Sequence, residues 1–212
     1  MSQPRDNPLR PEHFAREDET DDSRFYIEPK LVTHIDDAAI AAARAFYGQM
    51  LPPGGEVLDL MTSWVSHLPE THGFRAVAGL GMNVQELEKN GQLTERTIQD
   101  LNKEPTLPYD DGRFDGAIVT VSVQYLTSPV EVFAEVGRVL KPGAPFVVTY
   151  SNRCFPTKAV AIWRVLDDRD HADLVALYFR LSGQFSQAQA VDLSPNRGNR
   201  DPLYAVFAHR LG

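Results

Sequence analysis

Apolar and polar positions along the chain first follow a helical period. Residues 37–51, DAAIAAARAFYGQML, come after an aspartate and before the sequence PPGG. An aspartate is a common N-cap, and proline and glycine end helices. The positions that share one face of this helix are Ile40, Ala43, Tyr47 and Leu51. The pattern predicts an amphipathic helix followed by a tight turn.

Five short apolar runs follow, rich in the β-branched and aromatic residues that suit buried strands. They are EVLDL (56–60), FRAVAGLG (74–81), the weaker ERTIQD (95–100), FDGAIVTVSV (114–123) and APFVVTYS (144–151). Helix start signals lie between them, in NVQE (83–86) and in SPVE (128–131). Alternating strands and helices predict a doubly wound, mostly parallel sheet, with its ligand site at the C-terminal ends of the strands.

The C-terminal part has the pattern of one more helix, over 171–183, and then of two strands. The apolar segments 185–193 and 202–211 flank a polar loop, SPNRGNRD, at 194–201. Such a pair is typical of a hairpin-like antiparallel pair. The fold class expected is therefore α/β, with a doubly wound, mostly parallel seven-stranded sheet that ends in an antiparallel strand pair.

The first 24 residues differ from the rest of the chain. They contain many charges and prolines and almost no large apolar side chains. Burial of so little apolar surface does not offset the entropy lost on ordering, so residues 1–24 are predicted to be a disordered or loosely docked arm. The domain is expected to span 25–212.

Composition narrows the function. The chain has 212 residues, 42% hydrophobic and 24% charged, and a formal net charge of -8. This acidic balance disfavours nucleic-acid and anionic-membrane partners. The single cysteine, Cys154, excludes an internal disulfide and cannot by itself build a metal site, so no metal is expected. The sequence has no apolar run of membrane-spanning length and no hydrophobic signal core, and a cytoplasmic protein is expected.

The middle of the chain resembles the class I S-adenosylmethionine-dependent methyltransferases, in particular their small-molecule branch. The resemblance covers about residues 35–210, and its most specific stretch is 100–148. In that stretch LPYDDGRFD leads into one strand, EVGRVLKPG closes a helix and PFVV begins the next strand, with VLDL about forty residues upstream. The resemblance implies S-adenosylmethionine as the cofactor and a small-molecule methyl acceptor as the partner, with direct displacement at the methyl carbon.

The resemblance also implies which residues contact the cofactor. The glycines of the family's first turn fall here on Met61, Ser63 and Val65, and the acid that holds the ribose falls on Gly81. Asn83 and Glu86 are the nearby polar residues that could replace it. Asp100 matches the acid that meets the adenine amino group. The full set of implied cofactor-binding residues is Asp59, Leu60, Met61, Ser63, Gly81, Met82, Asp100, Leu101, Asn102, Val121 and Ser122.

The acceptor pocket is expected from segments near the same strand ends. Its candidate residues are Tyr26, His34, Tyr125, Asn152 and Arg153. Arg153 could clamp a substrate carboxylate or make only a surface ion pair, and both interpretations stay open. No catalytic base is assigned, because these residues contain no evident proton relay.

Two other functions compete with methyl transfer. The bulky Met61 and Trp64, together with Gly81, also suit a catalytically silent member of the fold that acts as a binding or regulatory protein. A nicotinamide dehydrogenase is disfavoured, because no G-x-G-x-x-G sequence follows any predicted strand.

Overall fold

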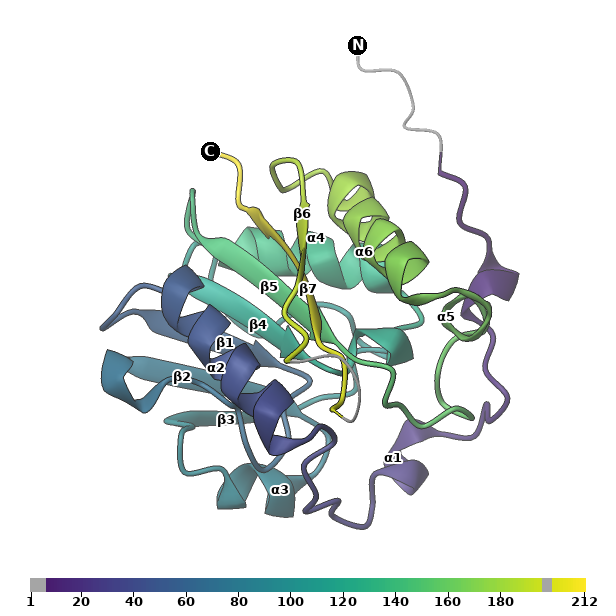
Figure 1. Ribbon diagram of the computed structural model, residues 1–212, viewed down its shortest axis with the longest axis horizontal. Coiled ribbons are helices and arrows are strands. Elements are labelled where there is room, and N and C mark those ends of the chain that lie inside the picture. The colour runs from purple at the N-terminus through teal and green to yellow at the C-terminus, as the bar shows by residue number, and fades with distance from the viewer. Residues whose placement is uncertain (1–6, 196–199) are drawn as a thin grey trace.

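The computed structural model describes residues 7–195 and 200–212 (Figure 1). Seven strands form one sheet in the order β3-β2-β1-β4-β5-β7-β6. The strands are β1 (Glu56–Leu60), β2 (Ala76–Gly81), β3 (Glu95–Ile98), β4 (Gly116–Thr120), β5 (Pro145–Tyr150), β6 (Gln189–Asp192) and β7 (Tyr204–His209). Neighbouring strands from β3 to β5 are parallel, and β7 is antiparallel to both β5 and β6. The predicted doubly wound sheet with a closing antiparallel pair is confirmed.

Helices cover both faces of the sheet, and short helical turns lie in the connections. The helices are α1 (Asp22–Phe25), α2 (Asp37–Met50), α3 (Val84–Lys89), α4 (Pro129–Val139), α5 (Ala161–Val165) and α6 (Asp168–Ser182). The 3-10 turns are η1 (Pro11–Phe14), η2 (Glu70–His72) and η3 (Val123–Tyr125). The helix predicted over 37–51 is present, with Asp36 as its N-cap. The last helix begins at Asp168, earlier than predicted, because Asp167 caps it.

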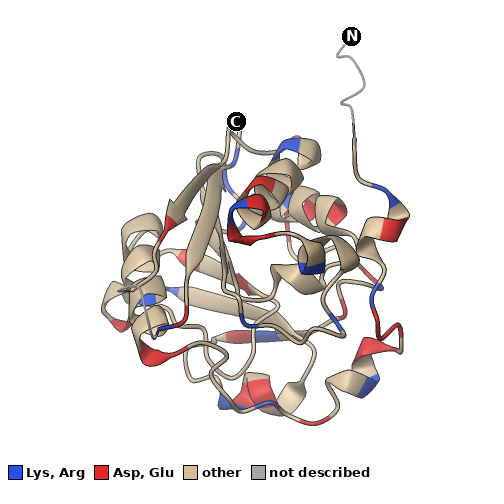
Figure 2. Ribbon diagram, turned by 45° about the vertical axis from the view of Figure 1, so that its right-hand side comes forward, with Lys and Arg blue, Asp and Glu red and all other residues tan. Residues whose placement is uncertain are grey.

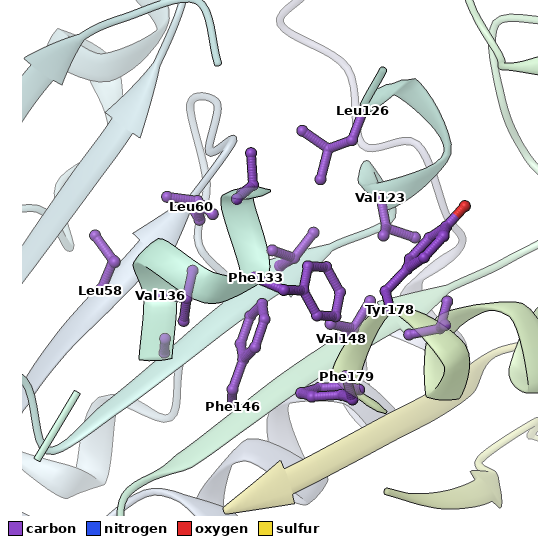
Figure 3. Close-up of a cluster of buried hydrophobic side chains, with 14 of the residues drawn as sticks. Leu58, Leu60, Val123, Leu126, Phe133, Val136, Phe146, Val148, Tyr178 and Phe179 are labelled. Atoms are coloured by element: carbon purple, nitrogen blue, oxygen red, sulfur yellow. The ribbon is translucent and has the colours of Figure 1, made fainter. Parts of the chain in front are cut away.

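The core has two parts, one on each face of the sheet. Alternate strand residues such as Leu58 and Phe146 belong to the part of the core that α4 and α6 cover, where Phe133 and Phe179 pack on Phe146 (Figure 3). Val57, Ile118 and Val147 face the opposite side, which α2 covers. A parallel sheet buried on both faces needs the near-continuous apolar strands that the sequence has. This rigid sheet holds the loops at its C-terminal end in place.

Part of the segment expected to be a disordered or loosely docked arm contacts the domain in the structure. Residues 7–36, here called the strap, run along the domain past α5 to α2 (Figure 1). The backbone N–H of Asp18 donates to Thr157 O at 2.9 Å, and the N–H of Ala161 donates to Ala15 O at 2.8 Å. Phe14 packs against the core near Tyr178. Residues 1–6 of the predicted arm, and part of the predicted loop 194–201, lie outside the described residues.

A buried ionic cluster explains why the strap docks without much apolar surface. Asp22 is only 5% exposed and accepts hydrogen bonds from Arg16 at 2.7 and 2.8 Å and from Asn102 at 3.0 Å. Lys158, which is fully buried, lies 3.0 Å from the same carboxylate. Hydrogen-bonded opposite charges tolerate burial, whereas an unpaired charge does not. Both signs of charge are visible along the strap in Figure 2. A prediction from apolar content alone therefore misses the contacts that hold residues 7–24 on the domain.

Candidate functional site

A cleft of about 220 Å³ lies at the C-terminal ends of β1 to β4, beneath the strap. This is where open α/β sheets bind ligands. Most of the site residues predicted from the sequence line it, although they come from distant parts of the chain. These are Tyr26, His34, Asp59, Met61, Ser63, Gly81, Met82, Asp100, Leu101, Asn102, Val121, Ser122, Tyr125 and Arg153.

Two of the predicted residues do not line the cleft. Leu60 is completely buried in the core, on the face shared with Leu58, because strand side chains alternate between the two faces of a sheet (Figure 3). Asn152 follows β5 but is exposed on the surface, whereas its neighbour Arg153 does reach the mouth of the cleft. Neither Leu60 nor Asn152 is placed to contact a ligand in the cleft with its side chain.

Asp59, next to the last residue of β1, is a buried carboxylate without a cationic partner among the described residues. The residue is 1% exposed and accepts a hydrogen bond from the Thr62 hydroxyl. Burial raises the pKa of Asp59 to about 7, and the hydroxyls of Ser66 and Thr62 offset only part of that rise. A cationic ligand group next to this carboxylate would favour its ionised form.

The turn after β1 takes an unusual path. Met61 and His67 both have φ of 55°, in the left-handed region that favours glycine. The N–H of Thr62 donates to Leu80 O at 2.9 Å, so the chain continues beside β2 instead of entering an α-helix. Methionine thus occupies a position whose backbone conformation favours glycine. Ser63, by contrast, does not have a positive φ.

His67 is a polar group enclosed by the same turn. It is 5% exposed, lines the cleft, and its Nδ1 has no hydrogen-bond partner among the described residues. Burial, with smaller contributions from Arg44 and His34, lowers the pKa of His67 to about 4. The imidazole is therefore neutral near pH 7.

The end of β2 has no room for a side chain. A Cβ on Gly81 would lie 2.3 Å from the backbone oxygen of Thr62, which is far inside van der Waals contact. The closest carboxylate after β2 belongs to Glu86, in the first turn of α3, and this residue is 6% exposed. Glu86 accepts hydrogen bonds of 2.6 Å from the Ser63 hydroxyl and from the N–H of Lys30. It lines the cleft.

The turn after β3 is an ordinary one. Asp100 Oδ1 accepts a hydrogen bond from the N–H of Asn102 at 3.0 Å, and Lys103 lies 3.7 Å from Oδ2. The Asn102 side chain in turn donates to Tyr125 O and to Asp22. The expected cofactor contact and the alternative role, capping of the turn, are both compatible with this geometry.

The turn after β4 supplies the other wall of the cleft. Val121 has φ of 45°, and its carbonyl accepts a hydrogen bond from the Gln124 side chain at 2.9 Å. Ser122 is 9% exposed, and its hydroxyl has no partner within the described part of the chain. An unpartnered buried hydroxyl beside a cleft can bind a ligand without first breaking a hydrogen bond.

Aromatic rings gather around Phe155 at the mouth of the cleft. Its ring centroid lies 5.2 Å from that of Phe25, 5.4 Å from that of His34 and 6.0 Å from that of Tyr125. The N–H of Phe155 donates to the Tyr125 hydroxyl. Burial lowers the pKa of His34 and raises that of Tyr26, so both side chains favour their neutral forms.

Arg153 lines the cleft and also forms an ion pair at the surface. Its Nε lies 2.7 Å from Asp201, and its side chain is 63% exposed. Of the two roles left open for Arg153, this geometry favours the surface ion pair. Cys154 lines the cleft, and burial raises the pKa of its thiol, which disfavours the reactive thiolate.

Several residues of the cleft were not found from the sequence. The strap contributes Arg16, Asp22 and Lys30, and the segment after β5 contributes Phe155 and Lys158. Single charged residues in polar segments carry no signal of burial, so only the tertiary structure reveals them. No group of three or more His, Cys, Asp or Glu side chains suited to a metal occurs in 7–195 or 200–212. Within those ranges no helix is long and apolar enough to cross a membrane.

Comparison with known sequences and structures agrees with this geometry. Residues 62–148 match the family model described as a methyltransferase domain. The chain carries a methyltransferase domain in this segment. Its seven-stranded sheet is the S-adenosylmethionine-binding, Rossmann-like methyltransferase fold.

Two curated relatives match the methyltransferase domain over short segments. The biotin biosynthesis bifunctional protein BioHC of Teredinibacter turnerae is 32% identical over 68 residues, which are 32% of this chain and 12% of that protein. Methyltransferase phqN of Penicillium fellutanum is 37% identical over 81 residues, 34% of this chain and 24% of that protein. The matched segments thus span less than a quarter of the length of either relative.

A solved structure shares the fold at low sequence identity. It is the geranyl diphosphate C-methyltransferase of Streptomyces coelicolor A3(2), in complex with Mg2+, geranyl-S-thiolodiphosphate and S-adenosyl-L-homocysteine. The sequences are 16% identical, the alignment covers 81% of this chain and 76% of that one, and the TM-score is 0.54. This similarity supports the fold of the methyltransferase domain.

The charges of the cleft fit S-adenosylmethionine, which carries a sulfonium and an ammonium group. Asp59, Glu86 and Asp100 all line the cleft. Asp59 and Glu86 receive only hydroxyl and backbone N–H donors from the described residues. Such carboxylates gain from a cationic ligand. The residues present are therefore compatible with this cofactor.

Proposed function

We propose that the protein transfers a methyl group from S-adenosylmethionine to a small-molecule acceptor. The observation that carries the proposal is the convergence of four strand ends and the strap on one cleft. Except for Leu60, the residues that the family resemblance assigns to the cofactor, Asp59 and Asp100 among them, line this cleft. The structural relative that methylates geranyl diphosphate supports a small molecule as the acceptor.

The two ends of the cleft suit different parts of the reaction. Asp100 and Leu101 offer a carboxylate and an apolar wall for the adenine, and Asp59 suits the cationic methionine end. When bound, S-adenosylmethionine supplies an electrophilic methyl group. The rings of Tyr125, His34 and Phe155 orient an apolar acceptor and exclude water. The His67 imidazole lines the cleft in its neutral form, and the burial that lowers its pKa also disfavours proton uptake there.

A silent binding protein remains the second candidate, because of the turn after β1. The chain there runs beside β2 and is not followed by an α-helix before β2, so no helix N-terminus points at the ligand from this turn. Helix N-termini are common anion sites, and their loss here weakens one contact to the carboxylate of the cofactor.

Titration calorimetry with S-adenosylmethionine and S-adenosylhomocysteine separates these functions at the first step. Micromolar binding of both supports the methyltransferase. A second measurement follows transfer of a deuterated methyl group from the cofactor into a small-metabolite extract by mass spectrometry. Folded protein that binds neither compound would contradict the proposal, and binding without any labelled product would favour the silent protein.

A further inference from the structure

The carboxylate expected after β2 is missing, and the structure has no room for an acidic side chain at that position. In doubly wound nucleotide-binding sheets an acid after the second strand accepts hydrogen bonds from the ribose hydroxyls. The position at the end of β2 is Gly81, where a Cβ would lie 2.3 Å from Thr62 O. The hydrogen bond from Thr62 N–H to Leu80 O holds that backbone in place. Any ribose acceptor must therefore come from another residue.

Glu86 is five residues further along the chain and faces the same cleft. Asn83 caps α3 by accepting a hydrogen bond from the N–H of Glu86 at 3.1 Å, and its side-chain amide donates to Tyr26 O at 2.8 Å. This cap fixes the first turn of α3 against the strap. The Glu86 carboxylate is thereby held in the cleft instead of extending into solvent, as the exposed Glu88 on the same helix does.

The Glu86 carboxylate still has capacity to bind a ligand. Its two oxygens each accept one hydrogen bond, from Lys30 N–H and from the Ser63 hydroxyl, both at 2.6 Å. An ionised carboxylate offers about four acceptor positions, so roughly two remain. The two donors also fix the rotamer, so a ligand hydroxyl meets an oriented acceptor. Among the described residues that line the cleft, no other Asp or Glu lies in the connection between β2 and β3.

We infer that Glu86 accepts the hydrogen bonds of the ribose hydroxyls and replaces the missing carboxylate at the end of β2. The inference rests on the proposed use of an adenosine-containing cofactor and adds a residue to it. Because Lys30 belongs to the strap, bound ribose and docked strap share one carboxylate. Ligand binding should therefore also protect the strap from hydrogen exchange near Lys30.

The test measures ribose recognition and does not require the acceptor. Calorimetry compares S-adenosylhomocysteine with its 2′-deoxy and 3′-deoxy forms on the wild type, Glu86→Gln and the control Glu88→Gln. A hydrogen bond to a charged group corresponds to about a 10- to 100-fold change in affinity. The wild type and Glu88→Gln should prefer the intact ribose by such a factor over at least one of the two deoxy forms. Glu86→Gln should show less than about a threefold preference.

The possible outcomes are distinguishable. Equal weakening of all three ligands in Glu86→Gln, with the preference for intact ribose retained, would overturn the role of Glu86 and leave the cofactor assignment standing. Wild type that binds none of the three would overturn the proposed function itself. If Glu86→Gln is unfolded by circular dichroism, Glu86→Asp decides: its charge is kept but its reach is shorter, so the ribose preference should fall while the negative charge remains.

Discussion

The turns after β1 and after β3 flank β2 and line the same cleft, but they are built in different ways. The β3 turn is held by hydrogen bonds within the turn. The Asp100 carboxylate accepts from the N–H of Asn102, and the Asp100 carbonyl accepts from the N–H groups of Lys103 and Glu104. The β1 turn contains two non-glycine residues with positive φ, Met61 and His67, and it follows a buried carboxylate at the end of the strand, Asp59. An ordinary turn is stable from its own local hydrogen bonds, whereas the β1 turn depends on its surroundings.

This difference shows that a position can lack the residue type expected from the family and still have the backbone conformation that this residue type favours. Glycine is absent from position 61, yet the left-handed backbone that glycine favours is present there. At Gly81 the residue type itself is constrained. The expected acid does not fit there, because the backbone of the β1 turn occupies the space that its side chain would need. One remodelled turn thus accounts for both departures from the family pattern. The predictions below test this account, from the largest expected effect to the smallest.

The largest effect should come from the buried carboxylate of the β1 turn. Burial raises the pKa of Asp59 from 3.8 to about 7. Between these values the folded protein retains a proton that the unfolded chain has lost, so the free energy of unfolding should fall as pH rises from about 4 to about 7 and then level off. The total fall attributable to Asp59 is about 4 kcal/mol.

Denaturant unfolding of the wild type and Asp59→Asn across this pH range measures that fall. The difference between the two proteins should change with pH, while the exposed control Asp110→Asn should track the wild type. Cofactor affinity should rise as pH increases through 7, since a cation favours ionised Asp59. A wild type and an Asp59→Asn variant with parallel pH profiles would show that Asp59 does not titrate in this window.

The contact between the β1 turn and β2 predicts the next largest effect. Gly81→Ala forces a Cβ against the backbone oxygen of Thr62, which cannot rotate away as a side chain does. Overpacking of this kind costs about 2–3 kcal/mol. The matched control is Gly91→Ala, where no heavy atom lies within 4 Å of the added Cβ. Its effect on unfolding should stay within about 0.5 kcal/mol. Similar stability of the two variants would show that the turn moves freely off β2.

The β3 turn should matter for binding more than for folding. Asp100→Ala removes the carboxylate assigned to the adenine amino group, and a hydrogen bond to a charged group contributes about 1.5–3 kcal/mol, or roughly a 10- to 100-fold loss of affinity. Asp100→Asn keeps one acceptor and should fall between the alanine variant and the wild type in calorimetric titration with S-adenosylmethionine. Because Asp100 also caps its turn, circular dichroism must first show that both variants fold. Undiminished affinity in a folded alanine variant would disprove the adenine assignment.

The sheet was predictable from sequence because its signals are local and repeated. Apolar runs such as 56–60 and 144–151 and the cap at 128–129 determine strands and helices without knowledge of their neighbours. The positions of Asp59 and Asp100 follow, since Asp59 lies near the C-terminal end of β1 and Asp100 lies two residues after β3. Leu60 was assigned to the site through the family resemblance, whereas strand alternation places its side chain in the core.

The strap and the path of the β1 turn were not predictable in the same way. Asp22 is buried only because Arg16, Lys158 and Asn102 reach it from three different segments. No sequence pattern within residues 7–24 predicts these contacts. The contact of Thr62 with Gly81 likewise joins two loops, and it appears in the sequence only as a glycine in place of an acid.

The smallest effect concerns the backbone of the β1 turn itself. Met61→Gly and Met61→Ala remove the same side-chain packing but differ in their cost at φ of 55°. Alanine should be the less stable of the two by about 1 kcal/mol, because the left-handed region costs residues with a Cβ roughly 1–2 kcal/mol. The same pair at Ser63, where φ is not positive, should show the ordinary order, with alanine equal to glycine or more stable by about 0.5–1 kcal/mol. Thermal or denaturant unfolding of the four variants gives both differences from one experiment. Alanine more stable than glycine at position 61 would mean that the turn does not keep the left-handed backbone, and that the missing glycine reflects a lost conformation after all.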